Sequence, residues 1–454
     1  MLNNQRPFKS RFFSFLITFF LFVLFFLLLN AIQTVKVTKV NNIIVENVNS
    51  RLPGEYLKEI MPTSSEDGYC KLNFRLPAQL FYSKDAISGS PEFEENSPYH
   101  TLHDVIEGRI DQDQPEVTYA THLTKEFVLY ISEVVRYWEG PVSIAAYVAD
   151  AEDVKLILEH MLHFCYCIPE MSRVSLHLVF KKDFQLNFTS TRTIAPANCD
   201  ILNLEQLNSG PDSDISYFAE EKSPSNNNWY PINVCRNVAR QASYTEYVLV
   251  CDIELMPSEN LASRFLEMTD TFSCLESSCE KRVFVVPVFE VESTENIPRT
   301  KAQLLDLIVS KKAVYFHQFT CTHCQKFPGL EQWKTTDPGD AITPLLETRR
   351  EIPYERWEPI FIGTKNEPLY NEQLSWEGFQ DKMLQMLEMC LAGYKMVILD
   401  GAFLVHWPGI KKSRRLKDES WRKPYVRKNQ RFYNKLLKGI ISKYPRNLYC
   451  KRVD

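Results

Sequence analysis

The sequence lacks several features that would have placed it in a familiar class of protein. It contains no internal repeat, which argues against a solenoid or propeller. It has neither a nucleic-acid-binding motif nor interleaved basic and aromatic residues, so we expect no nucleic acid partner. It has one CxxC, Cys321 to Cys324, but not the second closely spaced pair that makes a structural zinc site convincing.

Charge is absent from residues 12–29, and only two mildly polar residues interrupt this apolar run. A helix extended to residue 32 would be ~30 Å long, which matches the hydrocarbon core of a membrane. No small-x-small cleavage site follows the run, and the charges before it are all basic, at Arg6, Lys9 and Arg11. We therefore expect a single-pass type II membrane protein with a cytosolic tail at 1–11, an uncleaved signal anchor at 12–32 and a lumenal remainder.

The part beyond the anchor has the composition of a globular protein, because the chain is 44% hydrophobic and 24% charged. Residues 33–115 mix polar runs with turn residues and are interpreted as a stem and lead-in, and residues 116–411 as the main domain. Twelve cysteines can form disulfides in an oxidising lumen, although the sequence does not give their connectivity. Asn187 lies in the one N-glycosylation sequon, so this glycoprotein would carry its glycan there.

The C-terminal segment is strongly basic, although the whole chain has a net charge of -5. Residues 411–454 contain sixteen Lys and Arg against three Asp and Glu, a charge that suits an anionic glycan or a membrane surface. We favour a different interpretation, a helical tail over 412–454 that packs an apolar stripe on the domain and turns its basic side chains to solvent. The stripe consists of Phe432, Leu436, Leu437, Ile440 and Ile441.

Strand-like and helix-like segments begin to alternate at Val117. A strand over VTYATHL is followed by a helical stretch through Trp138, a strand over VSIAAYV, a helix over 151–164 capped by Asp150, and a strand over 174–180. Such alternation predicts an α/β fold with a largely parallel sheet. Sheets of this kind bind nucleotides at the C-terminal ends of their strands.

Two carboxylates follow the next predicted strand, YVLVC at 247–251. Asp252 and Glu254 are two positions apart, so in an extended chain their side chains point to the same side and can share a hard cation. A cation held there would neutralise the diphosphate that leaves during nucleotide-sugar transfer. Acidic pairs at strand ends also form caps and surface ion pairs, and both interpretations of the pair remain open from spacing alone.

A resemblance to a known family supports the metal interpretation. The stretches VTYATHLT with WEGPVSIA, YPINVCRNVAR leading into YVLVCDIELMPSENL, FVVPVFEV, CTHCQ, WEPIFIG, and WEGF through AGYKMVILDGAFLVHWPG occur in the family's order from about 117 to 411. They resemble glycosyltransferase family 49, the beta-1,4-glucuronyltransferases, which are related to the second catalytic domain of LARGE-type xylosyl- and glucuronyltransferases.

The resemblance implies a GT-A-like nucleotide-sugar-binding fold in a Golgi enzyme of protein O-glycosylation. It implies inverting beta-1,4 transfer of glucuronate from UDP-glucuronate to a glycan or glycoprotein acceptor, one that ends in xylose. It also implies Mn²⁺ as cofactor, with Asp252 and Glu254 in the family's DxD position and His406 completing the metal site. A histidine beside two carboxylates suits manganese. Apart from the resemblance, His406 would be interpreted as a half-buried histidine with satisfied partners.

The site departs from the family pattern at three positions. Glu254 replaces the second Asp, while Asn371 and Gln380 replace an acid and an Asn in the stretch that resembles YDERFxGYGxNK. Glu372, the remaining carboxylate of the acidic pair, is our candidate general base, with Glu290 as its competitor. These departures keep open a catalytically silent relative that binds glycans or acts as a chaperone.

Two further groups of residues need an interpretation. Arg236 and Arg240 are one helical turn apart and would share a face, from which a guanidinium can bind the donor's pyrophosphate or glucuronate, or simply face solvent. Cys321 and Cys324 follow a strand-like segment, as in a thiol-disulfide oxidoreductase. Pro328-Gly329 interrupts the long helix that such an enzyme needs, so we expect a structural, oxidised pair.

The predicted topology can be tested on the full-length chain expressed in cells. We expect the protein to stay in the membrane pellet after carbonate extraction and to lose mass on removal of N-glycans, with Asn187→Gln abolishing that loss. Secretion of a shortened soluble chain as the main product would contradict the anchor.

Overall fold

The computed structural model of the protein describes residues 52–65, 68–72, 97–109, 113–184, 196–201, 230–271, 281–411, 421–445, 447 and 449–450. The predicted anchor, most of the predicted stem and Asn187 lie outside these residues. Within the part that is described, no helix is both long enough and apolar enough to cross a membrane.

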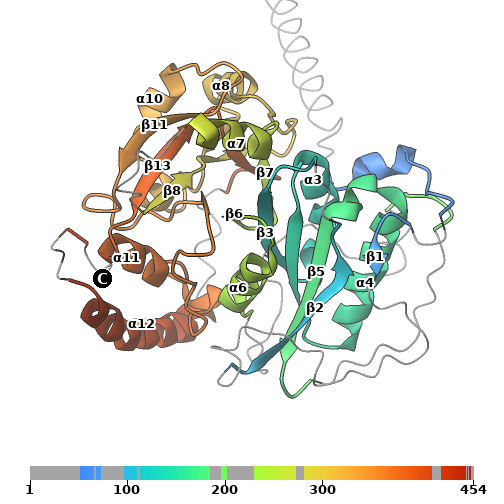
Figure 1. The fold of residues 1–454 in the computed structure, drawn as a ribbon, viewed down its shortest axis with the longest axis horizontal. Helices are drawn as coiled ribbons and strands as arrows, with labels where there is room; N and C mark the ends of the chain where they lie inside the picture. Colours follow the sequence, from blue (N-terminus) through green and yellow to red (C-terminus); the bar gives the residue numbers. More distant parts are fainter. Residues whose placement is uncertain are drawn as a thin grey trace, which may run out of the picture. The chain divides into compact units, whose positions relative to one another are not determined.

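A mixed sheet of ten strands forms the centre of the fold (Figure 1). Strands β5, β4, β3 and β6 run parallel to one another, as the alternation of strands and helices predicted. Beyond them β13 also pairs parallel with β8, but the prediction of a largely parallel sheet was wrong for the other pairs: β12 is antiparallel to both β6 and β8, and the outer strands β2 and β11 are antiparallel to their neighbours. In spatial order the strands are β1 (Lys71–Leu72), β2 (Tyr99–Glu107), β5 (Val174–Lys181), β4 (Val142–Tyr147), β3 (Val117–Leu123), β6 (Tyr247–Val250), β12 (Phe361–Gly363), β8 (Arg282–Val285), β13 (Lys395–Asp400) and β11 (Thr343–Thr348).

A second sheet of four strands holds the segments that follow β6, β8 and β13. Its spatial order is β10 (Ala313–Tyr315), β9 (Val288–Val291), β14 (Leu404–His406) and β7 (Leu255–Pro257). The sequence FVVPVF reads as one strand but divides between the two sheets, as β8 and β9, around Val286 and Pro287. Proline has no backbone N–H to donate to a ladder, which explains a break at this point.

Helices cover both faces of the parallel strands. Tyr119 and Ile144 point into the large core that includes α3 and α4, whereas the adjacent Ala120 and Ala145 pack under α6. Asp150 caps α4 as predicted, accepting a hydrogen bond from the backbone N–H of Asp153 at 2.9 Å. The α-helices are α3 (Tyr130–Tyr137), α4 (Ala151–Cys167), α6 (Ile232–Ala242), α7 (Leu261–Thr271), α8 (Lys301–Val309), α9 (Thr322–Gln325), α10 (Leu330–Thr335), α11 (Met383–Leu391) and α12 (Lys423–Lys443), and the 3-10 helices are η1 (Glu55–Glu59), η3 (Lys125–Phe127), η4 (Pro169–Arg173) and η5 (Trp376–Gly378).

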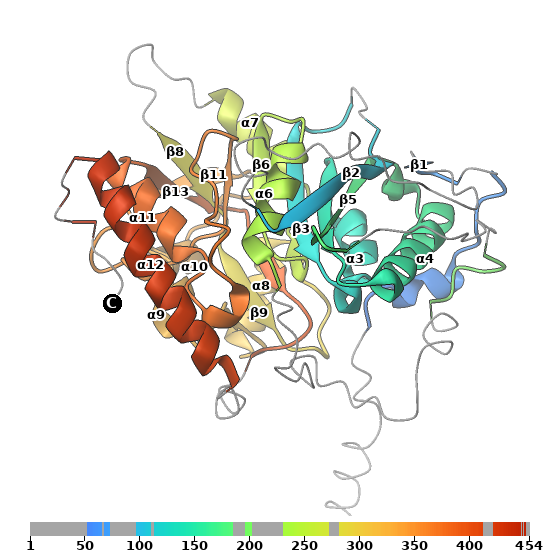
Figure 2. The same ribbon diagram turned by 90° about the horizontal axis from the view of Figure 1, so that it is seen from below.

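The basic helix α12 packs along α11, as both ribbon views show (Figures 1 and 2). Its Tyr433 and Leu437 are buried against Leu384 and Leu387 of α11. Of the predicted apolar stripe, Phe432, Leu436 and Ile440 also pack on this cluster, whereas Ile441 is exposed. The long helix therefore buries one apolar side, and that side lies next to η5.

Asn429 of α12 holds the segment around η5 in place. Its side-chain amide donates to the carbonyls of Ser375 at 2.7 Å and Phe379 at 2.9 Å, and its amide oxygen accepts from the N–H of Ser375 at 3.2 Å. A Cβ on Gly378 would lie only 2.2 Å from this amide, which explains the glycine there. Helix α12 and the loop around η5 are therefore joined by hydrogen bonds and by close packing at Gly378.

Replacing Asn429 with Ala should lower the free energy of unfolding by about 2–3 kcal/mol, because it leaves buried backbone groups of the loop without partners. Urea denaturation measures this, with Lys435→Ala on the exposed side of α12 as the matched control. An equal, near-zero effect of the two changes would mean that Asn429 does not fix the loop.

Candidate active site

The site is built at the ends of two neighbouring parallel strands. The register of β3 against β6 pairs Ala120 with Val250, so His122 and Asp252 lie level with each other two residues further on. Glu254 follows and directly precedes β7, and β14 pairs with β7 so that His406 lies opposite Leu255. The predicted strand-end carboxylates and the distant histidine are thus brought to one edge of the fold.

Glu254 and His406 face each other. Nε2 of His406 lies 3.4 Å from Oε1 of Glu254, and both side chains are largely buried. Burial alone would raise the pKa of Glu254, but His406 and then Lys411 lower it below the ordinary value, so the carboxylate is ionised. Among the described residues, neither ring nitrogen of His406 has a partner in good hydrogen-bonding geometry. A buried imidazole beside an ionised carboxylate, with neither ring nitrogen in a well-formed hydrogen bond to a described residue, is a donor set that suits a divalent metal.

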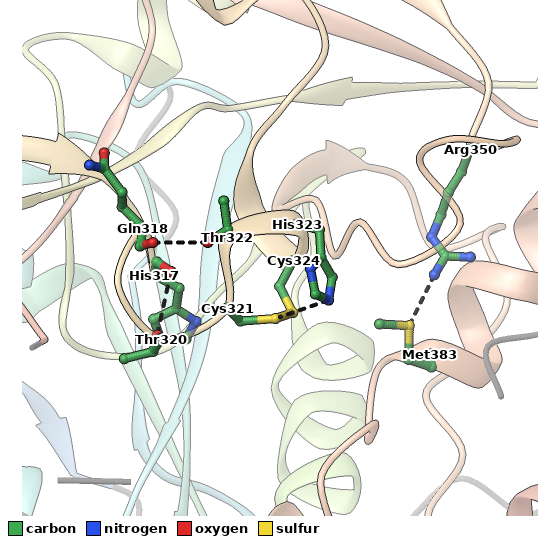
Figure 3. The surroundings of a disulfide bond; sticks show 9 residues. All are labelled: His317, Gln318, Thr320, Cys321, Thr322, His323, Cys324, Arg350 and Met383. Atoms are coloured by element: carbon green, nitrogen blue, oxygen red, sulfur yellow. Dashed lines mark hydrogen bonds between the residues drawn. A yellow bond between two sulfur atoms is a disulfide. The ribbon is translucent and has the colours of Figure 1, made fainter. Parts of the chain in front are cut away.

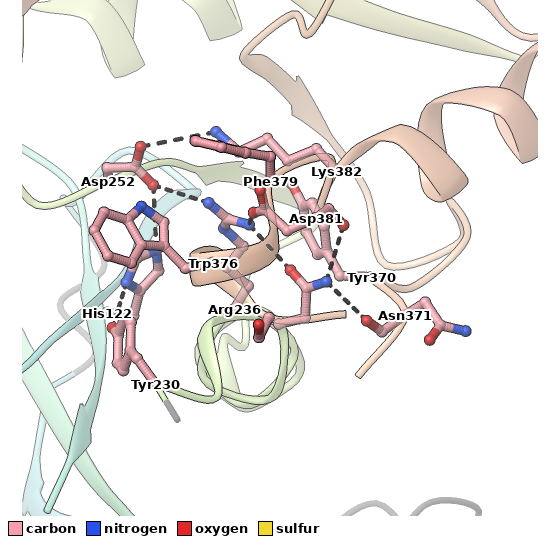
Figure 4. Close-up of polar contacts among 12 residues, drawn as sticks. His122, Tyr230, Arg236, Asp252, Tyr370, Asn371, Trp376, Phe379, Asp381 and Lys382 are labelled. Atoms are coloured by element: carbon pink, nitrogen blue, oxygen red, sulfur yellow. Dashed lines mark hydrogen bonds and ion pairs between the residues drawn. The ribbon is translucent and has the colours of Figure 1, made fainter. Parts of the chain in front are cut away.

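Asp252 is held by three other side chains (Figure 4). Its Oδ1 accepts from Nη2 of Arg236 at 3.2 Å and lies 3.2 Å from Nε2 of His122, and Nζ of Lys382 is 3.7 Å from Oδ2. Burial would raise the pKa of Asp252, yet Lys382, His122 and Arg236 together lower it well below its usual range. The carboxylate is therefore ionised, and 30% of its side-chain surface stays exposed.

The three predicted metal ligands are near one another without forming a closed cluster. Among the described residues, only Cys321, His323 and Cys324 bring three ligand atoms of this kind within 4.8 Å of one another. Glu254 and His406 make a pair, while Asp252 is turned to its cationic neighbours. The residues nevertheless fit a divalent cation, because among the described residues the nitrogens of His406 make no well-formed hydrogen bond and a cation can take the place of Lys382 beside Asp252.

His122 is a site residue that the sequence analysis missed. Burial lowers its pKa, so the ring is neutral. Its Nδ1 lies 2.6 Å from the hydroxyl of Tyr230 and its Nε2 faces Asp252. A tautomer that donates from Nε2 to Asp252 and accepts the Tyr230 hydroxyl satisfies both nitrogens. Its place at the end of a parallel strand was the signal in the sequence that could have found it.

The two arginines of α6 have different partners. Arg236 is buried and donates to Asp252, to Asp381 and to Asn233, so it ties the strand end to the segment after η5. Arg240 is buried as well, and its guanidinium donates to the carbonyls of Thr364, Glu367 and Pro368 and to the Glu367 carboxylate. Arg240 therefore binds the loop after β12. Of the two arginines, Arg236 is the one next to the strand-end carboxylates.

The carboxylates considered as general bases lie in different surroundings. Glu372 accepts from the Asn237 amide at 2.9 Å, and burial raises its pKa. Both oxygens of the fully buried Glu290 accept from backbone N–H groups, those of His317 and Lys411. Glu290 is therefore committed to holding two loops, whereas Glu372 keeps one oxygen outside its bond to Asn237.

Glu358, in the WEPIFIG stretch, is a further carboxyl that the sequence analysis did not single out. Burial, with a smaller contribution from Asp381, raises its pKa to about 7, although Lys382, Arg350 and Arg236 act in the opposite direction. A carboxyl that titrates near neutrality beside this cluster of charges can move a proton at physiological pH. A lone acid in a short strand-like stretch gave no signal of this in the sequence.

The CxxC forms a disulfide between Cys321 and Cys324, as predicted (Figure 3). Helix α9 contains only four residues, so the long helix of a thiol-disulfide oxidoreductase is absent after this pair. The carbonyl of Cys324 accepts from the N–H of Glu358 at 2.8 Å. The disulfide thus braces the segment that carries Glu358. The other disulfides between described residues are Cys70–Cys165, Cys167–Cys199 and Cys390–Cys450.

Replacing Glu358 with Gln should make the protein more stable at pH 8 but not at pH 4. The folded state binds the Glu358 proton more tightly than the unfolded chain does, so stability falls as the pH rises from about 4.5 to about 7. The variant should be more stable by up to about 3 kcal/mol at pH 8. Thermal unfolding at several pH values measures this, and a pH-independent difference would contradict the shifted pKa.

Comparisons with known proteins identify the family of this chain. Residues 116–445 match the family model described as "Glycosyl-transferase for dystroglycan", that is, glycosyltransferase family 49. Beta-1,4-glucuronyltransferase 1 of Bos taurus is 25% identical over 373 residues, which cover 82% of this chain and 85% of the relative. The protein of that name from Danio rerio is 28% identical over 338 residues, 72% of this chain and 73% of the relative.

A more distant relative is xylosyl- and glucuronyltransferase LARGE1 of Homo sapiens, 21% identical over 298 residues. The match covers 65% of this chain but 32% of LARGE1. Most of the chain, including the strand-end carboxylates and His406, lies inside the matched family region. The chain therefore belongs to glycosyltransferase family 49 and is a glycosyltransferase.

Proposed function

We propose that this protein transfers glucuronate from UDP-glucuronate, with inversion and in beta-1,4 linkage, to a xylose-ended glycan in protein O-glycosylation. The pair of Glu254 and His406 beside Asp252, at the strand ends of a family 49 chain, carries this proposal. The names of the relatives support glucuronate as the sugar. The proposal includes a GT-A-like fold and a type II anchor in the Golgi membrane.

The donor would lie at the strand ends, with its diphosphate beside two carboxylates and one imidazole. Glu254, His406 and Asp252 are the proposed ligands of Mn²⁺, which would supply positive charge to the leaving UDP. Arg236 keeps Asp252 oriented and ionised in a partly buried site. Lys382 is the partner of Asp252 that a divalent cation would replace, and its ammonium group would then be available to the donor's diphosphate.

Glu372 remains our proposed general base. Its bond to Asn237 orients the carboxylate, and its raised pKa suits a group that accepts the proton of the acceptor hydroxyl. Glu358 competes for this role because it is the carboxyl with a pKa near 7 beside Arg236 and Lys382. A loss of activity in Glu358→Gln that is greater than the loss in Glu372→Gln would assign the role to Glu358.

The proposed function is tested by a donor screen on the detergent-solubilised full-length chain. UDP release is measured with Mn²⁺ and a panel of UDP-sugars, with and without a methyl β-xyloside. UDP-glucuronate should give release that depends on both metal and xyloside. Equal or greater release from another UDP-sugar would overturn the choice of donor.

Asp252→Ala and His406→Ala should each weaken Mn²⁺-dependent binding of UDP-glucuronate at least about tenfold, because each removes a ligand of the cation. Isothermal titration measures binding, and circular dichroism checks that the variants fold. Glu331→Ala removes an exposed carboxylate on α10 and serves as the matched control. Full metal-dependent activity in Asp252→Ala would rule out the metal site described here.

A further inference from the structure

Aromatic side chains gather on the loop that follows the candidate base. Phe379 is 42% exposed, although it belongs to a tightly held segment, and Trp376 precedes it in η5. The guanidinium carbon of Arg422 lies 4.0 Å from the ring centre of Phe379 and 4.1 Å from that of Trp376. Arg422 is buried and donates to the carbonyls of Trp376 and Glu377. The buried guanidinium of Arg422 therefore packs against both aromatic rings.

The backbone of this loop is strained where it presents the exposed ring. Phe379 has a φ of 56° with a ψ of 175°, and Gln380 has a φ of 57°, so two successive residues with side chains have a positive φ. Such a conformation costs energy and persists only where the surrounding structure fixes it. Asn429 fixes it here, because its amide holds the carbonyl of Phe379. The structure thus keeps an apolar ring in solvent at a cost in stability.

The same loop continues directly into the donor site. Asp381, two residues after Phe379, pairs with Arg236, and Lys382 pairs with Asp252. Figure 4 labels Trp376, Phe379, Asp381 and Lys382 around the strand-end carboxylate. Phe379 therefore lies within a few residues of chain from the place where the donor's diphosphate is expected.

A sugar ring is the ligand that suits an exposed aromatic ring at this place. A β-xylopyranose has equatorial hydroxyls, no exocyclic carbon, and axial C–H bonds on both faces. Such a face can lie flat on an aromatic ring and bury apolar surface, while the hydroxyls at its edge still bond to polar groups. Binding sites for small ligands commonly combine aromatic walls with a few polar groups in this way.

We infer that Phe379, supported by Trp376 and Arg422, is the platform on which the terminal sugar of the acceptor stacks. The inference rests on the proposed function and adds to it the residues that select the acceptor. The platform orients the acceptor's hydroxyl toward the donor at the strand ends. It favours a pyranose with equatorial substituents, because an axial hydroxyl would hold the sugar ring away from the face of the Phe379 ring.

The test measures sugar binding without catalysis. Saturation-transfer NMR on the full-length chain with methyl β-xyloside should show the strongest transfer to the axial ring protons. Phe379→Ala should weaken xyloside binding about tenfold, and Phe379→Tyr, which keeps the ring, should restore it to within about twofold. Tyr449→Ala removes an exposed ring on another surface, beside Lys281 and Gly393, and should leave binding unchanged.

Kinetics then separate this inference from the proposed function. With UDP-glucuronate, Phe379→Ala should raise the KM for xyloside about tenfold and leave the donor Kd unchanged. Xyloside binding that is absent, or equal in wild type and Phe379→Ala, would overturn the platform. A wild type that binds xyloside through Phe379 but transfers no glucuronate would overturn the proposed function and leave the platform in place.

Discussion

The buried guanidinium of Arg236 is the interaction on which the site depends. It joins Asp252, at the end of β6, to Asp381, after η5, and it does so from α6 on the face of the sheet. Burial alone would lower the pKa of Arg236, and the two carboxylates raise it instead. Removing one partner from such a set leaves an uncompensated charge in a region of low dielectric, which is strongly destabilising. The positions of the sheet, the helix and the loop are therefore coupled through one side chain.

This coupling also keeps Asp252 ionised and oriented at the place where we propose that a cation binds. A carboxylate that is ionised and oriented before the ligand arrives has little reorganisation to undergo. His122 and Arg236 hold Oδ1, and Lys382 is the partner on Oδ2. A lysine on a flexible stem is easier to displace than a buried guanidinium with several bonds. Oδ1 of Asp252 is thus held in place, whereas the partner of Oδ2 can be exchanged.

Local patterns in the sequence predicted the elements that position the site. Periodicity predicted strands at 117–123 and 174–180, which the structure has at 117–123 and 174–181. Capping chemistry predicted the Asp150 cap, and the proline and glycine after the CxxC predicted a structural disulfide there. The three-residue strand β12 has too few residues to show a period, so the mixed character of the sheet was missed. Lys382 and Asp381 join the site through pairing with Arg236 and Asp252, more than a hundred residues earlier, and no local pattern encodes such a contact.

The disulfide between Cys390 and Cys450 fastens the end of α11 to the chain beyond α12, across 60 residues. Even when the packing between the two helices opens, this link holds α12 at a high effective concentration next to its docking surface. Re-docking is then an intramolecular event, and Asn429 returns to the loop it shapes. The geometry of the loop around η5 is in this way made dependent on the redox conditions under which Cys390 and Cys450 pair.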